Sequence, residues 1–178
     1  MKEDVQVLDH ATDIMKALKT GVLITGKADG QVNPMTISWG VFGIEWARPI
    51  FTTFVRTGRF THDLIEKNPE FTVSVPFGAF DKKILGVCGS TSGRETNKIE
   101  RLGLTLVEPS VTSVPGIKEL PLILECRVVY KQDQDLSAMS EDFRNSYYPH
   151  DIPSSAFGAN KDTHTAYYGE VVAAYIVR

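Results

Sequence analysis

The sequence predicts a mainly β protein, built as an antiparallel barrel with short flanking helices. Two observations carry this prediction: many strand-like segments follow one another at short spacing, and the helical patterns between them are short. A third observation argues against a doubly wound sheet, because the fingerprints GxGxxG and GxxxxGK[ST] are both absent. The chain of 178 residues has the size of one domain, so we expect a single domain over 1–178.

The first third of the chain begins as a helix and continues as strands. Apolar residues between Asp9 and Lys19 recur at helical spacing, with Asp9 as the predicted cap and Gly21 as the stop. The Asp29-Gly30 pair predicts a hairpin turn. The strand-like segments on either side of this turn and beyond it are 21–27, 32–44 and 49–56.

The remaining elements alternate between strand and short helix. Thr61 stands at the predicted cap of a helix over 61–68, which ends before Pro69. A long loop over 146–162 is rich in Pro, Gly, Asn and Ser, and such loops often close a site. The other predicted elements are strands at 70–76, 121–131 and 166–178, and helices at 82–90 and 95–103.

Composition and charge narrow the function classes. The net charge is -3 at pH 7, with Lys and Arg scattered along the chain, which argues against duplex nucleic acid as a partner. No stretch approaches the roughly 18 apolar residues of a membrane span, so no membrane partner is expected. The first ten residues carry acids where a secretory signal has its apolar core, so we expect a cytoplasmic protein.

The cysteine and histidine patterns argue against several other classes. Cys88 and Cys126 stand far apart without CxxC spacing, which disfavours a zinc knuckle, a redox pair and a disulfide framework. No HxxxH or carboxylate-His spacing indicates a metal, and no GxSxG elbow marks a serine hydrolase.

The first candidate site is an anion site formed by Arg56, Arg59 and Thr61. Two guanidiniums and a hydroxyl come directly before a predicted helix, where free N–H groups and the helix dipole favour an anion. A monophosphate would suit this site. The alternative is structural: both Arg side chains are solvated and Thr61 only caps the helix.

The second candidate is the segment 90–98, a hydroxyl-rich turn that contains Ser92 and leads into a helix with Lys98 in its first turn. A cation at this end of a helix opposes the helix dipole. Lys98 therefore either points to solvent or answers an external anion. Spacing alone favours solvent.

The third candidate is a strand over 33–39 that starts at Asn33. Its period of two predicts that Thr36 and Ser38 share one face and that Met35 and Trp39 share the other. The hydroxyls could line a polar ligand. The alternative is an ordinary half-buried strand with Trp39 in the core.

Among the histidines, His164 is the candidate for a functional role. It stands at the start of the last predicted strand, where its side chain could face a pocket. The alternative is a structural or exposed histidine.

Taken in order, these segments resemble the flavin reductase-like family of FMN-binding split barrels, and its flavoredoxin-like branch in particular. The resemblance runs from about residue 20 to the C-terminus. The motifs that carry it are Asn33-Pro34-Met35-Thr36-Ile37-Ser38-Trp39, Arg56-x-x-Arg59-x-Thr61-x-x-x-Ile65, Ser92-Gly93-Arg94-x-x-x-Lys98 and His164-x-x-x-x-Gly169-Glu170-Val171.

This resemblance implies a six-stranded split β-barrel that forms a homodimer and binds FMN non-covalently near the subunit interface. Thr61 and Lys98 would then reach the phosphate. The other cofactor contacts implied by the motifs are Asn33, Met35, Thr36, Ser38, Trp39, Arg56, Arg59 and Ser92. Asn97 departs from the family, which often has Asp before the Lys, and the departure removes one charge.

The resemblance also implies an oxidoreductase that takes hydride from NADH or NADPH and passes electrons to free flavin, oxygen or a redox protein partner. His164, which matches the family's His before Gly-Glu-Val, is then the candidate for a side chain acting near the nicotinamide or the flavin. Two alternatives stay open: a flavoredoxin-like electron carrier without its own NAD(P)H oxidation, and a barrel that has lost its flavin.

Overall fold

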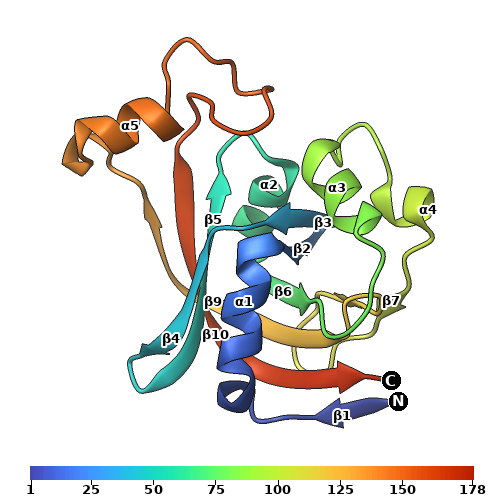
Figure 1. The fold of residues 1–178 in the computed structure, drawn as a ribbon. Helices are drawn as coiled ribbons and strands as arrows, with labels where there is room; N and C mark the ends of the chain where they lie inside the picture. Colours follow the sequence, from blue (N-terminus) through green and yellow to red (C-terminus); the bar gives the residue numbers. More distant parts are fainter.

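The computed structural model describes residues 1–178 and shows one large antiparallel sheet with short helices packed around it (Figure 1). The sheet has eight strands: seven follow one another in the order β3-β2-β6-β9-β10-β5-β4, and β1 pairs with β10 off this path. β7 and β8 form a separate two-stranded sheet. The predicted mainly β, antiparallel fold is confirmed, with eight strands in the main sheet where six were expected.

The strands alternate with helices along the chain. The main-sheet strands are β1 (Lys2–Asp4), β2 (Val22–Ala28), β3 (Gln31–Ile37), β4 (Gly40–Glu45), β5 (Arg48–Arg56), β6 (Glu70–Val75), β9 (Leu122–Asp133) and β10 (His164–Val177). The small sheet contains β7 (Leu106–Val107) and β8 (Gly116–Ile117). The helices are α1 (Ala11–Thr20), α2 (Phe60–Lys67), α3 (Lys83–Ser90), α4 (Lys98–Leu102) and α5 (Glu141–Tyr147), with 3-10 turns at Val7–His10 and Leu136–Ala138.

The barrel is split between its two edge strands. β3 and β4 lie at opposite ends of the strand order and do not pair, although only Ser38 and Trp39 separate them in the chain. The sheet therefore curls until its edges come together at these two residues. Because no strand ladder closes the barrel here, side chains near Ser38 and Trp39 can face a ligand.

A continuous apolar core fills the curled sheet. Phe51, Phe71 and Tyr167 are among its largest fully buried side chains. Gly169 makes room for one of them, since a Cβ at this position would lie 2.5 Å from Cζ of Phe71. The ladder between β9 and β10 shifts register between Tyr168 and Gly169, so the glycine that interrupts the last predicted strand sits at a bulge.

The first predicted helix and hairpin are confirmed, with a different cap. α1 begins at Ala11 after a 3-10 turn, and His10 rather than Asp9 occupies the cap position. Gly21 follows the last helical residue with a φ of 125°. The turn at Asp29-Gly30 has φ values of 51° and 74°, the left-handed conformation that a two-residue hairpin loop requires.

Three other predictions need correction. The segment 32–44 is not one strand, because it passes from one edge of the sheet to the other and breaks at Ser38 and Trp39. Thr61 is not the cap of α2, which begins at Phe60 with Arg59 at the cap position. The helix predicted over 95–103 is shorter, since Asn97 caps α4 through its side-chain oxygen.

Candidate functional site

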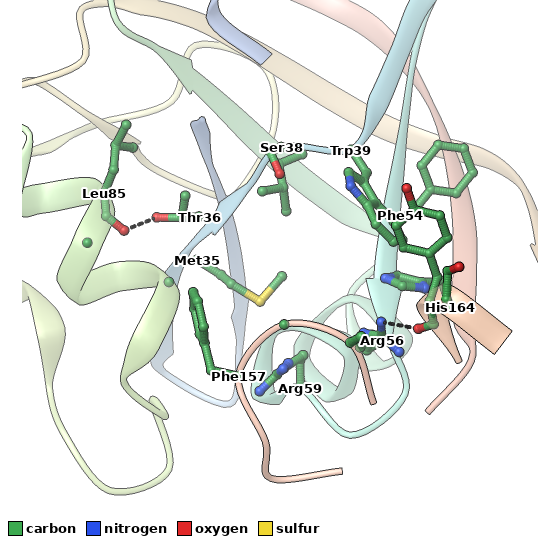
Figure 2. Close-up of a pocket in the computed structure, with 17 residues that line it drawn as sticks. Met35, Thr36, Ser38, Trp39, Phe54, Arg56, Arg59, Leu85, Phe157 and His164 are labelled. Carbon is green, nitrogen blue, oxygen red and sulfur yellow. Dashed lines mark hydrogen bonds between the residues drawn. The ribbon is translucent and has the colours of Figure 1, made fainter. Parts of the chain in front are cut away.

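Two adjoining pockets open where the barrel is split, and each has a volume of about 500 Å³. The first, here called the aromatic pocket, is shown in Figure 2. The second, here called the polar pocket, lies between the turn after β5 and the turn after α3. Met35, Arg59 and Gly89 line both, so one ligand could occupy the two together.

All of the predicted site residues line these pockets. The aromatic pocket takes Met35, Thr36, Ser38, Trp39, Arg56, Arg59 and His164. The polar pocket takes Asn33, Met35, Arg59, Thr61, Ser92 and Lys98. Segments far apart in the sequence thus form one continuous site across the split.

Lys98 is buried in the wall of the polar pocket instead of pointing to solvent. Lys98 is 3% exposed, and its Nζ donates to the carbonyl oxygens of Pro34 at 2.9 Å and Cys88 at 3.2 Å. Burial lowers the pKa of Lys98 to about 8, and nearby Arg59 lowers it further while Cys88 opposes the shift. The ammonium group donates only two of its three hydrogens to protein acceptors, so the third is available to bind an anion.

Asn33 and Thr61 are also buried, and they bond to each other. Nδ2 of Asn33 donates to Oγ1 of Thr61 at 2.8 Å. The Thr61 oxygen is thus an acceptor in this bond, which leaves its own hydrogen for another partner. Gly93 packs so closely that a Cβ there would lie 2.0 Å from Oδ1 of Asn33, so the turn after α3 can approach β3 only with glycine at this position.

The polar pocket carries an excess of positive charge. Arg59, Arg94 and Lys98 line it, against the single carboxylate of Glu95. The guanidinium of Arg94 is already engaged, because it pairs with Asp63 at 2.6 Å and donates to the carbonyl of Gly58 at 2.9 Å. The pocket therefore favours a small anion held mainly by Lys98 and Arg59.

Ser92 and Asn97 shape the turn that borders this pocket. Oγ of Ser92 accepts from the backbone N–H of Arg94 at 3.2 Å, which tightens the turn. Oδ1 of Asn97 accepts from the N–H groups of Ile99 and Glu100. A side-chain oxygen is all that this cap requires, so Asn97 fills the position without the negative charge that Asp would bring beside Lys98.

Cys88 lines the polar pocket as well, but as a neutral thiol. Burial raises its pKa to about 11, although Lys98 opposes the shift. Only the thiolate is a nucleophile, so Cys88 has no nucleophilic role at neutral pH. Both cysteines are free and buried.

Along the aromatic pocket, the side chains of residues 35–39 do not point alternately to two opposite faces as they would in a regular strand. Thr36 and Ser38 line it together with Met35 and Trp39, because the strand ends at Ile37. Oγ1 of Thr36 donates to the carbonyl of Leu85 at 2.7 Å, which fastens β3 to α3. Trp39 is 39% exposed, so it is not the core residue that the alternative interpretation expects.

Arg56 is buried and fastens the long loop before β10. Its Nη1 donates to the carbonyl of Asn160 at 2.8 Å and to that of Asp162, and its Nη2 donates to that of Tyr147 at 3.0 Å. Arg59 reaches the same loop at the carbonyl of Ala156, 3.4 Å away. The two Arg side chains thus hold the loop over the pockets as well as lining the site.

His164 faces the aromatic pocket from the first position of β10, as the sequence predicts for its place in the chain. Its ring centroid lies 5.0 Å from that of Trp39, and its Nδ1 lies 2.7 Å from the hydroxyl of Tyr148. Burial lowers its pKa to about 3, with Arg56 and Arg59 adding to the shift. The imidazole is therefore neutral at physiological pH.

Sequence reasoning missed several residues of the site. Tyr147, Phe157 and Phe54 line the aromatic pocket. Phe157 is 78% exposed although it lies in the pocket wall, so it offers an uncovered apolar ring (Figure 2). The only sequence signal for Phe157 was its apolar aromatic side chain within an otherwise polar loop.

The fold and the two pockets define a split antiparallel barrel with an anion pocket beside an aromatic pocket. The sequence profile described as "Flavin reductase like domain" matches residues 15–178. The chain belongs to this flavin reductase-like family, which confirms the resemblance.

Individual relatives agree with this assignment. An uncharacterized protein of Archaeoglobus fulgidus is 38% identical over 112 residues, which are 63% of this chain and 61% of that protein. The matched stretch thus spans less than two thirds of that relative. The flavoredoxin of Methanosarcina acetivorans superposes with a TM-score of 0.63 at 25% identity, over 89% of this chain and 68% of that one. An NADH:FAD oxidoreductase of Streptomyces globisporus superposes with a TM-score of 0.62 at 16% identity, over 88% and 75%.

Proposed function

We propose that the protein is an FMN-binding oxidoreductase of flavin reductase type, which moves electrons from NADH or NADPH through bound FMN to free flavin or another acceptor. The observation that carries the proposal is the buried ammonium of Lys98 in an anion pocket that adjoins an aromatic pocket. FMN has a phosphate at one end and a planar ring system at the other, and the two pockets suit these two ends.

The phosphate would lie in the polar pocket. Lys98 has one ammonium hydrogen without a protein partner, and the hydroxyl hydrogen of Thr61 is likewise unused. Arg59 adds a guanidinium to the lining of this pocket. Charge-assisted bonds from these groups are of the kind that hold phosphate dianions.

The ring system would lie in the aromatic pocket beside the end of β3. Met35, Thr36, Ser38 and Trp39 would contact it, in part through their backbone groups, because the ladder stops at Ile37. When bound, the flavin would supply the redox chemistry, accepting a hydride and passing the electrons on. The protein would position the ring and hold His164, as a neutral imidazole, beside it.

The second candidate is a flavoredoxin-like electron carrier, favoured by the similarity to the flavoredoxin of Methanosarcina acetivorans. The first candidate is favoured by the similarity of fold to the NADH:FAD oxidoreductase of Streptomyces globisporus. Anaerobic mixing of the FMN-loaded protein with NADH or NADPH separates them. Rapid bleaching of the flavin absorbance at about 450 nm supports the enzyme, and bleaching by dithionite alone supports the carrier.

FMN binding itself is tested first. The purified protein, or its flavin-free form titrated with FMN, should show that absorbance at micromolar FMN. A protein that neither copurifies with FMN nor binds it at this concentration would overturn both candidates.

A second copy of the chain is proposed to cover the outer face of β4, β5, β10 and β9. One row of this face runs from Val41 through Thr52 and Tyr168 to Tyr130 in register. Trp46, 57% exposed at the tip of the β4–β5 hairpin, packs against Tyr130 and Tyr168 at ring centroid distances of 6.2 and 6.3 Å. An uncovered aromatic face of this kind typically marks an interface.

This face continues into the aromatic pocket, since Phe54 and His164 follow on the same side of β5 and β10. A homodimer formed through it would therefore border the flavin site of each subunit. If obligate, its interface should exceed about 2,000 Å² in total. None of the helices combines the length and the apolar character of a membrane span. A cytoplasmic location is a separate part of the proposal.

A further inference from the structure

Behind the aromatic pocket, three side chains form a hydrogen-bonded series with a defined direction. Oε1 of Gln134 accepts both the backbone N–H of His164 at 3.3 Å and the hydroxyl of Tyr148 at 2.5 Å. The backbone N–H can only donate, so it fixes which end of the Gln134 amide faces inward. The single hydrogen of the Tyr148 hydroxyl is therefore committed to Gln134.

This commitment sets the tautomer of His164. The hydroxyl oxygen of Tyr148 lies 2.7 Å from Nδ1 of His164, and it can only accept here because its hydrogen is used elsewhere. Nδ1 must carry the imidazole hydrogen, which leaves a lone pair on Nε2. The pKa of about 3 excludes the doubly protonated ring at neutral pH.

The ring that bears this lone pair is held in place and open to the pocket. Trp39 lies against one side at an interplanar angle of 37°, and Tyr148 meets the ring edge-on at 86°. Arg56 approaches the same region (Figure 2), but its bonds go to carbonyl groups of the long loop. No protein group bonds to Nε2, so His164 offers an acceptor on the pocket wall.

We propose that Gln134 and Tyr148 are positioning residues that hold His164 as a hydrogen-bond acceptor, so that the pocket selects a ligand with an N–H donor at this point. The inference rests on the proposed function. Two ligand groups carry the required donor: the imide N–H at position 3 of the flavin ring and the carboxamide of reduced nicotinamide. A group that only accepts would leave Nε2 unpaired and would bind less well.

The tautomer is measured directly from the nitrogen-15 chemical shifts of His164. In the wild type, Nδ1 should be the protonated nitrogen. Gln134→Leu frees the Tyr148 hydrogen to turn toward Nδ1 and should shift the population to the Nε2–H form, whereas Gln134→Glu keeps an acceptor and should retain the wild-type form. Tyr168→Phe, on the same strand and face, should leave the tautomer of His164 unchanged, since His164 bonds to Tyr148 and Gln134 and not to Tyr168. A wild-type ring protonated at Nε2 would overturn the inference.

The ligand preference is measured with two matched pairs: FMN against FMN methylated at N3, and the reduced dinucleotide against its 3-acetylpyridine analogue. In the pair whose N–H group meets His164, the ligand that carries the donor should bind to the wild type about 3- to 10-fold more tightly than the ligand that lacks it. The pair that shows the preference identifies the group that meets His164. In Tyr148→Phe the preference should fall below about twofold, as expected for the loss of one hydrogen bond.

The same variant separates hydrogen bonding from crowding. Tyr148→Phe leaves the space around Nε2 unchanged, so a preference caused by the bulk of the methyl group would persist in it and would overturn the inference. If the wild type binds no FMN, the proposed function fails. If it binds FMN but the preference is equal in the wild type and in Tyr148→Phe, only the positioning role fails.

Discussion

Nζ of Lys98 lies 2.9 Å from the carbonyl oxygen of Pro34, so the ammonium group is fixed against β3 inside the polar pocket. Removal of this cation, in Lys98→Ala, should weaken FMN binding by roughly 10- to 150-fold, the cost of one charge-assisted bond. Riboflavin, which lacks the phosphate, should lose far less. Titration of the flavin-free protein by fluorescence measures both affinities.

Thr61→Val provides a matched variant in the same pocket. It keeps the shape of the side chain and removes the hydroxyl that bonds to Asn33. Its affinity for FMN should also fall more than its affinity for riboflavin. Equal losses for the two ligands in both variants would place Lys98 and Thr61 outside the phosphate site.

The pH dependence of FMN binding should report the same lysine. Burial lowers the pKa of Lys98 to about 8, and a bound phosphate stabilises the protonated form and raises that pKa again. FMN affinity should therefore be fully present between about pH 7, where the phosphate is a dianion, and pH 8, and it should decrease as the pH rises further. Riboflavin affinity should stay level over the same range, and so should the weaker FMN affinity of Lys98→Ala.

The role of Lys98 illustrates what the sequence could and could not predict. Its spacing alone favoured solvent, because burial of an ammonium depends on the Pro34 and Cys88 carbonyls that only the fold brings together. The family motifs placed it at a phosphate, and the structure buries it in a pocket suited to one. Arg56 was predicted to contact the cofactor, and in the structure it also bonds to carbonyl groups of the long loop before β10. These bonds could not be predicted, because no local pattern shows that this loop returns to the end of β5.

The fold was predictable where local patterns are strong. The Asp29-Gly30 turn and the stop of α1 at Gly21 follow from backbone conformations that glycine tolerates. The break at Ser38 and Trp39 was not predictable, since strand composition continues through it and only the closure of the sheet interrupts the ladder. Short edge elements such as β1 depend on pairing with β10 and have no pattern of their own.

Trp46→Asn should dissociate the proposed homodimer without unfolding the chain. Trp46 and Ala47 form the hairpin turn with φ values of 51° and 57°, a conformation in which Asn is more favourable than Trp. The change therefore relieves the turn while it removes the aromatic ring from the outer face. Light scattering after gel filtration should give the mass of one chain, with an unchanged circular dichroism spectrum.

Val111→Asn serves as the control, because Val111 is an exposed apolar residue outside that face. It should keep the mass of the wild type. If the wild type is a monomer at micromolar concentration and still binds FMN, the homodimer proposal is wrong.

Glu125→Gln should destabilise the fold by about 1.5–3 kcal/mol, the usual contribution of a hydrogen bond to a charged group. The fully buried carboxylate accepts the backbone N–H groups of Ser110, Val111 and Thr112. Burial raises its pKa, but these bonds outweigh burial and leave the pKa below the ordinary value. Urea unfolding should show a lower midpoint at an unchanged slope, whereas Glu108→Gln, at an exposed position, should match the wild type.

The sign of the pH effect follows from this depressed pKa. The stabilisation by Glu125 should be complete above the ordinary Glu pKa of about 4.3 and should be lost as the pH falls through the lower folded value. The stability difference between the wild type and Glu125→Gln should therefore shrink in acid. A difference that stays constant down to pH 2 would contradict the assignment of the charge.

His164→Ala should slow reduction of bound FMN by NADH or NADPH by about 10- to 100-fold, or about 1.4–2.8 kcal/mol in the barrier, while most FMN binding remains. The reason is the loss of an oriented imidazole beside the flavin or the nicotinamide. His164→Asn should recover part of the rate if hydrogen bonding is what matters.

Because burial keeps the ring neutral down to a pKa of about 3, His164 should add no pH dependence to the rate between pH 5 and 8. Stopped-flow absorbance on the FMN-loaded protein measures these rates, with the exposed His150→Ala as control. A rate for His164→Ala within twofold of the wild type would leave His164 with a structural role only, visible as a small change in melting temperature.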